Sequence, residues 1–268
     1  MVRIFQIAVF SCAIALLIGC NGSEEDVPIW EGVKIGDIAP TTGTQRKGAQ
    51  LLKTINFNVY VFELPADNIS VLDGIWPMLH TKPLQFNDYE AFSANSFLVG
   101  FGQVPMWNRI RGLLLGGGAE KTETVSLVLT DGQYRDYRLA RLDSEQTVFY
   151  IPSGGTMEGA TIGPGKIALR ITAEKDPTSR GVCDVNFLPV FTPRLSSAIP
   201  QLAARAKMKE FLFTPVGFGL KMSPGDFVFL WPRKYSKDQI TLSSLFFSRP
   251  KSHKPVVRAY LFVCAMVD

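Results

Sequence analysis

The second half of the chain contains a series of short apolar runs with a period of two residues, and this pattern constrains the fold most. Between residues 123 and 268, at least seven such runs are separated by Gly, Pro, Asp or Ser. In the clearest run, Ile167, Leu169 and Ile171 alternate with Ala, Arg and Thr. Successive side chains of a strand point to opposite faces, so each run predicts a half-buried strand. Residues 121–268 are therefore expected to form a mainly antiparallel, β-rich module, either a sandwich or a partial barrel.

Two turn signals make the expected strand pairing more specific. Asp131-Gly132 lies between the runs at 125–129 and 134–139. Asp-Gly in that position predicts a hairpin, because Gly adopts positive φ without steric cost. Pro224-Gly225 suits a type II turn. The strand that follows this second turn is expected to pair back onto the strand before it.

Residues 51–120 alternate strand and helix patterns instead, which predicts a small α/β module ahead of the β-rich module. We expect strands at 55–64 and 97–102, a helix at 88–95, and a further helix from Pro105 to the glycines at 116–118. The residues at 69–79 have helical spacing, but Pro77 within that pattern predicts that this helix kinks or ends near Ile75. The first strand has apolar residues on both faces, which predicts an interior position in its sheet. The expected fold class for the whole chain is thus α+β.

The first 20 residues have the composition of an export signal. An Arg near the start is followed by an apolar run that ends at Gly19. This run is short for a membrane span, which needs about 20 residues, and fits a secretory signal better. Its last residues, Leu17-Ile18-Gly19-Cys20, resemble the lipobox of bacterial lipoproteins. The resemblance implies a signal peptide at residues 1–19 and a diacylglycerol with palmitate-type acylation on Cys20. A plain signal peptide or an uncleaved anchor helix is the alternative.

The residues that follow Cys20 bear on where the anchored protein resides. In the sorting pattern of proteobacterial lipoproteins, Asp after the lipidated Cys retains the protein in the inner membrane. Asn21 stands there in this chain, which favours the outer membrane over the inner one. Residues 20–50 are polar and show little periodicity. We expect them to be a flexible tether that holds the folded part away from the bilayer.

Two cysteines remain beyond the signal and the lipidation site, namely Cys183 and Cys264. Outside the cytosol such a pair can form a disulfide. The bridge would close a loop of about 80 residues and add roughly 4 kcal/mol of stability in the chain-entropy model. Apolar residues flank both cysteines, so two buried free thiols in strands are the alternative.

One basic stretch near the end of the chain predicts a surface for anionic partners. The full-chain net charge of +4 is too small to indicate nucleic acid. Between residues 233 and 258, however, seven basic residues stand against a single acid, Asp238. The basic residues are Arg233, Lys234, Lys237, Arg249, Lys251, Lys254 and Arg258. Such a surface would attract lipid head groups or acidic glycans. A solvated loop face is the alternative.

The sequence offers few combinations for catalysis or metal binding. His80 and His253 are the two histidines, and neither has a carboxylate or cysteine at ligand spacing, so no metal is expected. The small residues 153–156 lack the Gly-x-Ser-x-Gly pattern of a nucleophilic serine. Carboxylate pairs of the kind that glycosidases use lie at expected turns or caps. These pairs are Asp88/Glu90, Asp131/Asp136 and Asp143/Glu145. We expect no cofactor, and an envelope hydrolase is an alternative function.

A short segment resembles part of the secretin family. Residues 217–224, GFGLKMSP, contain a G-x-x-L-x-x-x-P run, and the alternating strand pattern at 226–230 follows. This resembles the strand-turn-strand near the end of the secretin β-domain, over about 15 residues. The resemblance implies an envelope-complex component that assembles through strand edges. Our leading expectation is an anchored envelope lipoprotein with a structural or binding role, whose partner is an envelope protein, a lipid head group or an acidic glycan.

Overall fold

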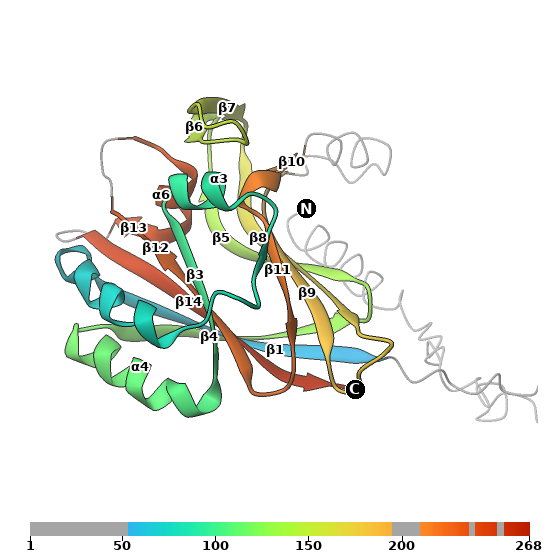
Figure 1. Cartoon of the computed structure of the whole chain (residues 1–268). Helices are drawn as coiled ribbons and strands as arrows, with labels where there is room; N and C mark the ends of the chain where they lie inside the picture. Colours follow the sequence, from blue (N-terminus) through green and yellow to red (C-terminus); the bar gives the residue numbers. More distant parts are fainter. Residues whose placement is uncertain (1–52, 195–209, 236–238, 251–254) are drawn as a thin grey trace, which may run out of the picture. The chain divides into compact units, whose positions relative to one another are not determined.

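The computed structural model describes residues 53–194, 210–235, 239–250 and 255–268 (Figure 1). All of them belong to one compact unit, Leu52–Asp268. The predicted signal peptide, the lipidation site Cys20 and the tether lie outside the described residues. None of the helices in the described ranges is long and apolar enough to cross a membrane.

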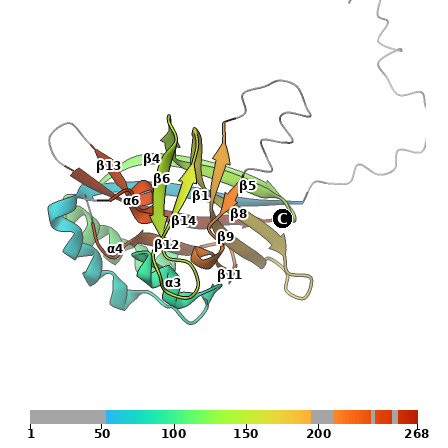
Figure 2. The ribbon, with the colours of Figure 1, turned by 90° about the horizontal axis from the view of Figure 1, so that it is seen from above.

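The largest part of the described structure is two antiparallel sheets, which we name sheet A and sheet B (Figures 1 and 2). Sheet A has the order β3-β12-β14-β1-β4, and β13 also pairs with β14. Its strands are β1 (Thr54–Pro65), β3 (Phe97–Gln103), β4 (Glu120–Thr130), β12 (Asp226–Pro232), β13 (Ser248–Pro250) and β14 (Pro255–Val267). The prediction that the first strand is interior is confirmed, since β1 pairs with β14 on one side and β4 on the other.

Sheet B has the order β2-β11-β9-β8-β5, and β10 also pairs with β9. Its strands are β2 (Gln85–Phe86), β5 (Tyr134–Leu142), β8 (Gly165–Lys175), β9 (Cys183–Pro193), β10 (Phe211–Leu212) and β11 (Phe218–Met222). A separate hairpin consists of β6 (Gln146–Tyr150) and β7 (Glu158–Ile162). The start of β1 lies beside the end of β14, because the Asp268 N–H donates to the Thr54 carbonyl at 3.0 Å.

The helices of the described residues are short, and most of them precede residue 117. They are η2 (Ala66–Gly74), η3 (Trp76–Met78), α3 (Tyr89–Ala94), α4 (Val104–Gly116), η4 (Thr214–Val216) and α6 (Leu242–Phe247). The helical segment predicted at 69–79 consists of the two 3₁₀ segments η2 and η3, and the predicted break near Ile75 is confirmed, because Ile75 separates them and Pro77 lies in the second. The predicted helix at 88–95 is confirmed as α3, with Asp88 as its N-cap.

Sheet A is covered on both faces, so the folded unit has three layers. Along β12, Val228 and Leu230 belong to the core between the two sheets. The alternate residues Phe227, Phe229 and Trp231 belong to a second core, which η2 and α4 complete on the other face. All seven residues of β12 are buried. A strand buried on both faces needs apolar side chains at successive positions, which explains the continuous apolar run in this part of the sequence.

The predicted α+β class with a mainly antiparallel, sandwich-like β-rich part is confirmed. The predicted boundary near residue 120, however, does not separate two compact units. Strands β1 and β3 from the expected α/β module pair with β14 and β12 from the expected β-rich module in the same sheet. The two parts share this sheet because its central strands cannot be buried on both faces without the helical segment between β1 and β3.

Both predicted turns exist, but the expected pairing across them is wrong. Gly132 has φ of 74° and Gly225 has φ of 91°, as the turn chemistry requires. Strand β4 before the first turn lies in sheet A, and β5 after it lies in sheet B. The second turn carries the chain back, from β11 in sheet B to β12 in sheet A. Each turn therefore joins the two layers of the sandwich instead of closing a hairpin.

Gly100 of β3 allows the segment after η3 to lie directly against this strand. The His80 N–H donates to the Phe101 carbonyl at 2.8 Å. A Cβ added at Gly100 would lie 2.5 Å from the Cβ of Leu79, which is rigid because it belongs to the buried core. Gly100 is thus required by a close approach of two chain segments and not by its own φ.

We expect Gly100→Ala to lower the free energy of unfolding by about 1–3 kcal/mol, because the core must move to admit the methyl group. The matched control is Gly112→Ala in α4, where an added Cβ meets no atom within 4 Å. That variant should be more stable by about 0.5–1 kcal/mol, since Ala is favoured over Gly in a helix. Urea denaturation of the purified proteins measures both values. Equal stability of Gly100→Ala and the wild type would contradict the close packing.

Candidate binding groove

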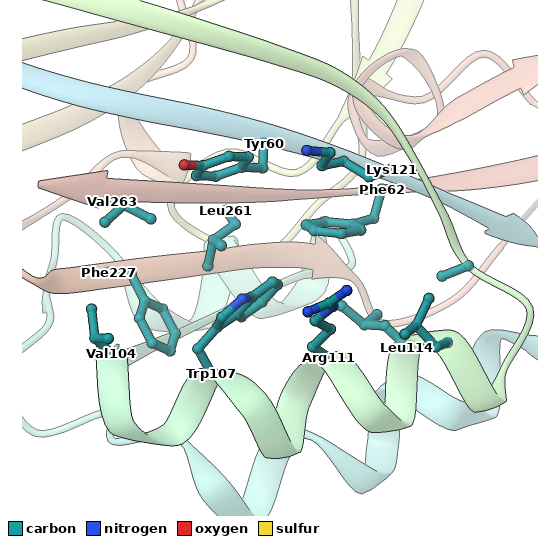
Figure 3. A pocket seen from close by; sticks show the side chains of 12 residues that line it. Tyr60, Phe62, Val104, Trp107, Arg111, Leu114, Lys121, Phe227, Leu261 and Val263 are labelled. Carbon is teal, nitrogen blue, oxygen red and sulfur yellow. The ribbon is translucent and has the colours of Figure 1, made fainter. Parts of the chain in front are cut away.

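A hollow of about 480 Å³ lies between α4 and the face of sheet A that points away from sheet B (Figure 3). We name it the α4 groove. Twelve residues from α4, β1, β4, β12 and β14 and the α4–β4 connection line it. Its aromatic walls are Tyr60, Phe62, Trp107 and Phe227, and its two cations are Arg111 and Lys121. This volume lies within the range of small-molecule sites, about 300–1,000 Å³.

Helix α4 presents two different stripes, and only one of them packs onto the sheet. Ile110 and Leu114 are fully buried in the core beneath the helix. The groove is lined by Val104, Trp107 and Arg111 at helical spacing, together with Leu114 and Leu115. This second stripe was not predicted from the sequence, although its spacing is visible there.

The ends of α4 are fixed, so the groove has a defined width. At the start of the helix, the Val104 N–H donates to the Gly225 carbonyl at 3.1 Å. At its end, the Asn68 side-chain amide donates to the Gly117 carbonyl at 2.9 Å. Gly118 has φ of 75° and turns the chain from the helix into β4. The turn between β11 and β12 and the segment η2 thus hold the helix from opposite ends.

The cations of the groove come from opposite walls, Arg111 from α4 and Lys121 from β4 (Figure 3). The Lys121 ammonium lies over the Tyr60 ring, 5.6 Å from the ring centroid. Neither cation is within 4.0 Å of a carboxylate among the described residues. An apolar groove that contains unpaired cations can hold a ligand with an apolar body and a negative group.

A second hollow, of about 380 Å³, lies over β5, β8 and the end of β9. Arg138, Arg141, Lys166 and Arg194 line it. Arg141 already pairs with Asp143 at 2.7 Å, and both side chains are exposed. Its lining contains no aromatic side chain, so it offers a ligand less apolar surface than the α4 groove does. This hollow is therefore the weaker of the two as a binding site.

The predicted basic surface is divided by the fold. Arg249 and Arg258 both donate to one oxygen of the buried Glu63 carboxylate, at 3.3 and 3.2 Å. Arg233 and Lys234 are exposed. Lys237, Lys251 and Lys254 lie outside the described residues. Arg249 and Arg258 hence have an internal partner, and anion binding by the others stays a prediction.

Glu63 is buried because it continues the inward-facing residues of β1. Its side chain is 2% exposed, and its neighbour across the β1–β14 ladder is Arg258. Arg258 also donates to the Leu139 carbonyl of β5 at 3.3 Å. Nearby, the buried Tyr260 donates to the Phe246 carbonyl at 2.6 Å, and burial raises its pKa to about 12. These polar groups join sheet A to sheet B and to α6.

The fold brings the predicted cysteine pair together. Cys183 begins β9 in sheet B, Cys264 lies in β14 of sheet A, and both are buried free thiols. The Cys183 thiol also donates to the Met222 carbonyl at 3.5 Å. A hydrogen bond with Cys264, together with burial, raises the pKa of the Cys183 thiol. The disulfide between them stays a prediction.

The candidate catalytic residues have structural partners. The Ala91 N–H donates to Asp88 at the start of α3, which lowers the pKa of that carboxyl. Asp131 accepts the Lys175 N–H at 2.8 Å, and Asp136 pairs with Arg170 at 2.8 Å. Residues 153–155 lie in the connection between β6 and β7. Within the described ranges, no group of three or more His, Cys, Asp or Glu could hold a metal ion.

No family model and no curated protein matches the sequence. Among solved structures, the chain is similar to the InvG secretin domain β-barrel of the Salmonella SPI-1 injectisome, at 11% identity and a TM-score of 0.24, over 81% of this chain and 63% of that chain. It is also similar to the V. cholerae type IV competence pilus secretin PilQ, at 11% identity and a TM-score of 0.26, over 81% and 61%.

The chain thus spans less than two thirds of either secretin chain. TM-scores this low assign neither a fold nor a function. The segment that resembles secretins in sequence, residues 217–230, folds as β11, a turn and β12. These two strands lie in different sheets.

We expect Glu63→Ala to lower the free energy of unfolding by about 3–5 kcal/mol, because it leaves the Arg258 guanidinium buried without its carboxylate. The matched control is Glu120→Ala, since Glu120 is the neighbour of Glu63 on β4 but is exposed. The control should change stability by less than about 0.5 kcal/mol. Urea denaturation of the purified variants measures the difference. Similar values for the two variants would show that the Glu63–Arg258 pair does not hold the sheets together.

Proposed function

We propose that this protein is a lipid-anchored component of the cell envelope whose folded unit binds a ligand in the α4 groove. The observation that carries the binding role is the groove itself, an apolar hollow with two cations, Arg111 and Lys121, that pair with no carboxylate among the described residues. The lipobox-like residues 17–20 support export and anchoring. The candidate catalytic carboxylates, by contrast, cap a helix, hold a turn or pair with arginine.

An anchor on Cys20 would place the groove close to a membrane surface. Two or more acyl chains bind a bilayer far more firmly than a single myristoyl group, which gives only reversible binding. Residues 21–52 would then set how far the folded unit stands from the bilayer. Asn21 favours the outer membrane as the site of anchoring.

Metabolic labelling with a clickable fatty acid tests the anchor. We expect the wild-type protein to carry the label and to sediment with membranes. In Cys20→Ala both properties should be lost, because the acylated thiol is absent. Cys12→Ala is the matched control and should keep both, since Cys12 lies within the predicted signal peptide. A wild-type protein without label, or a Cys20→Ala protein that is still labelled, would rule out the anchor.

Export would also expose Cys183 and Cys264 to an oxidising compartment. A disulfide-containing oxidase would then take one hydrogen from each thiol, so that its own disulfide becomes a dithiol and the two sulfurs form a bond. We expect the exported protein, denatured without reductant, to react with no alkylating reagent at these positions. After reduction both should react, as detected by mass spectrometry.

The control for the bridge is the same chain without residues 1–19, carrying Cys20→Ala and produced in the cytosol. Both thiols of that control should react without prior reduction, because cytosolic thiols are kept reduced. Two reactive thiols in the exported protein as well would contradict the bridge.

A further inference from the structure

We propose that the ligand of the α4 groove is a single-chain amphiphile with an anionic head group, such as a long-chain fatty acid. This inference rests on the proposed binding role of the groove. It adds the chemical class of the ligand and the residues that select it: Arg111 and Lys121 for the head group, and the aromatic walls for the chain.

The groove walls suit an alkyl chain. The Trp107 ring lies 5.6 Å from the Phe62 ring and 6.4 Å from the Phe227 ring, measured between centroids. Together they form an apolar strip that runs from β1 across α4 to β12. Val104, at the entrance, is 54% exposed. An occupied groove would remove this apolar surface from water, at about 25 cal/mol per Å².

The size of the groove favours one chain over two. Its volume of about 480 Å³ is in the lower half of the range known for small-molecule sites. Val104, Phe227 and Val263 line one end of the groove, Arg111 and Lys121 lie farther along it, and Leu114 lies past Arg111 (Figure 3). A ligand whose tail lies toward Val104 and Phe227 would bring a charge at its terminus to these cations.

The head-group end has no competing anion among the described residues, since no described carboxylate lies within 4.0 Å of Arg111 or Lys121. Glu123, on the same strand as Lys121, lies opposite Val61, whose side chain belongs to the core between the sheets. An arginine guanidinium can hold a carboxylate or phosphate through two parallel hydrogen bonds. The contact of Lys121 with the Tyr60 ring positions the second cation.

Calorimetric titration of residues 20–268 carrying Cys20→Ala tests the ligand class. The probes share one chain and differ in the head group: hexadecanoate, hexadecyl phosphate, hexadecanol and hexadecyltrimethylammonium, each below its micelle concentration. We expect both anions to bind, and the alcohol and the ammonium to bind at least about tenfold more weakly, because an unpaired cation near the ligand selects for negative charge.

Three variants separate the parts of the groove. Arg111→Gln with Lys121→Gln should weaken hexadecanoate binding by about 10–100-fold. Arg109→Gln with Lys82→Gln removes the same charge from exposed positions outside the groove and should leave binding unchanged. Val104→Trp fills the apolar entrance and should weaken every probe alike. Circular dichroism verifies that each variant is folded.

The outcomes distinguish the ligand class from the binding role. Equal binding of hexadecanol and hexadecanoate, lost in Val104→Trp but kept in the double Gln variant, overturns the anionic head group and leaves the groove as a binding site. No binding of any probe overturns both the ligand class and the proposed function. Binding to phosphatidylglycerol vesicles without binding to monomeric hexadecanoate overturns the single-chain ligand, since the contact is then with a membrane surface.

Discussion

The double burial of sheet A is the constraint on which the rest of the structure depends. Its central strands β12 and β14 contribute one face to the core between the sheets and the other to the core beneath η2 and α4. A charged group buried in this sheet is therefore costly unless it has a partner inside the protein. The inward-facing Glu63 of β1, which pairs with β14, meets this requirement through Arg258, and the same arginine reaches a carbonyl of sheet B. One ion pair thus satisfies a buried charge and joins the two layers.

The α4 groove follows from the way the helices cover sheet A. Helix α4 is held at its first residue by the turn between β11 and β12 and near its last by η2. It packs through Ile110 and Leu114, which leaves the strip with Trp107 and Arg111 beside it. The aromatic rings fill part of this space but do not close it. The backbone that carries the two cations is consequently held by packed secondary structure, while their side chains are exposed.

Local patterns predicted the elements better than their partners. Period-two alternation located β1, β3 and β8 within a few residues, and Asp88 located the start of α3. The Asp131-Gly132 and Pro224-Gly225 turns were recognisable, yet each of them joins a strand of one sheet to a strand of the other. Turn chemistry fixes a change of chain direction, whereas pairing depends on packing among strands that are distant in sequence. The α4 groove was not predicted for the same reason, since five elements that are distant in sequence form its walls. The one local sign of it in the sequence is the second stripe of residues on α4.

The position of β1 has a mechanical consequence. Its first residue, Thr54, is the point at which the preceding chain joins sheet A, and β1 is bonded to β14 on one side and to β4 on the other. If the anchor proposed at Cys20 holds the chain at a membrane, a pull on that anchor would reach the folded unit at Thr54. Because the Asp268 N–H donates to the Thr54 carbonyl, the last strand of the chain would share this pull at the point where it arrives.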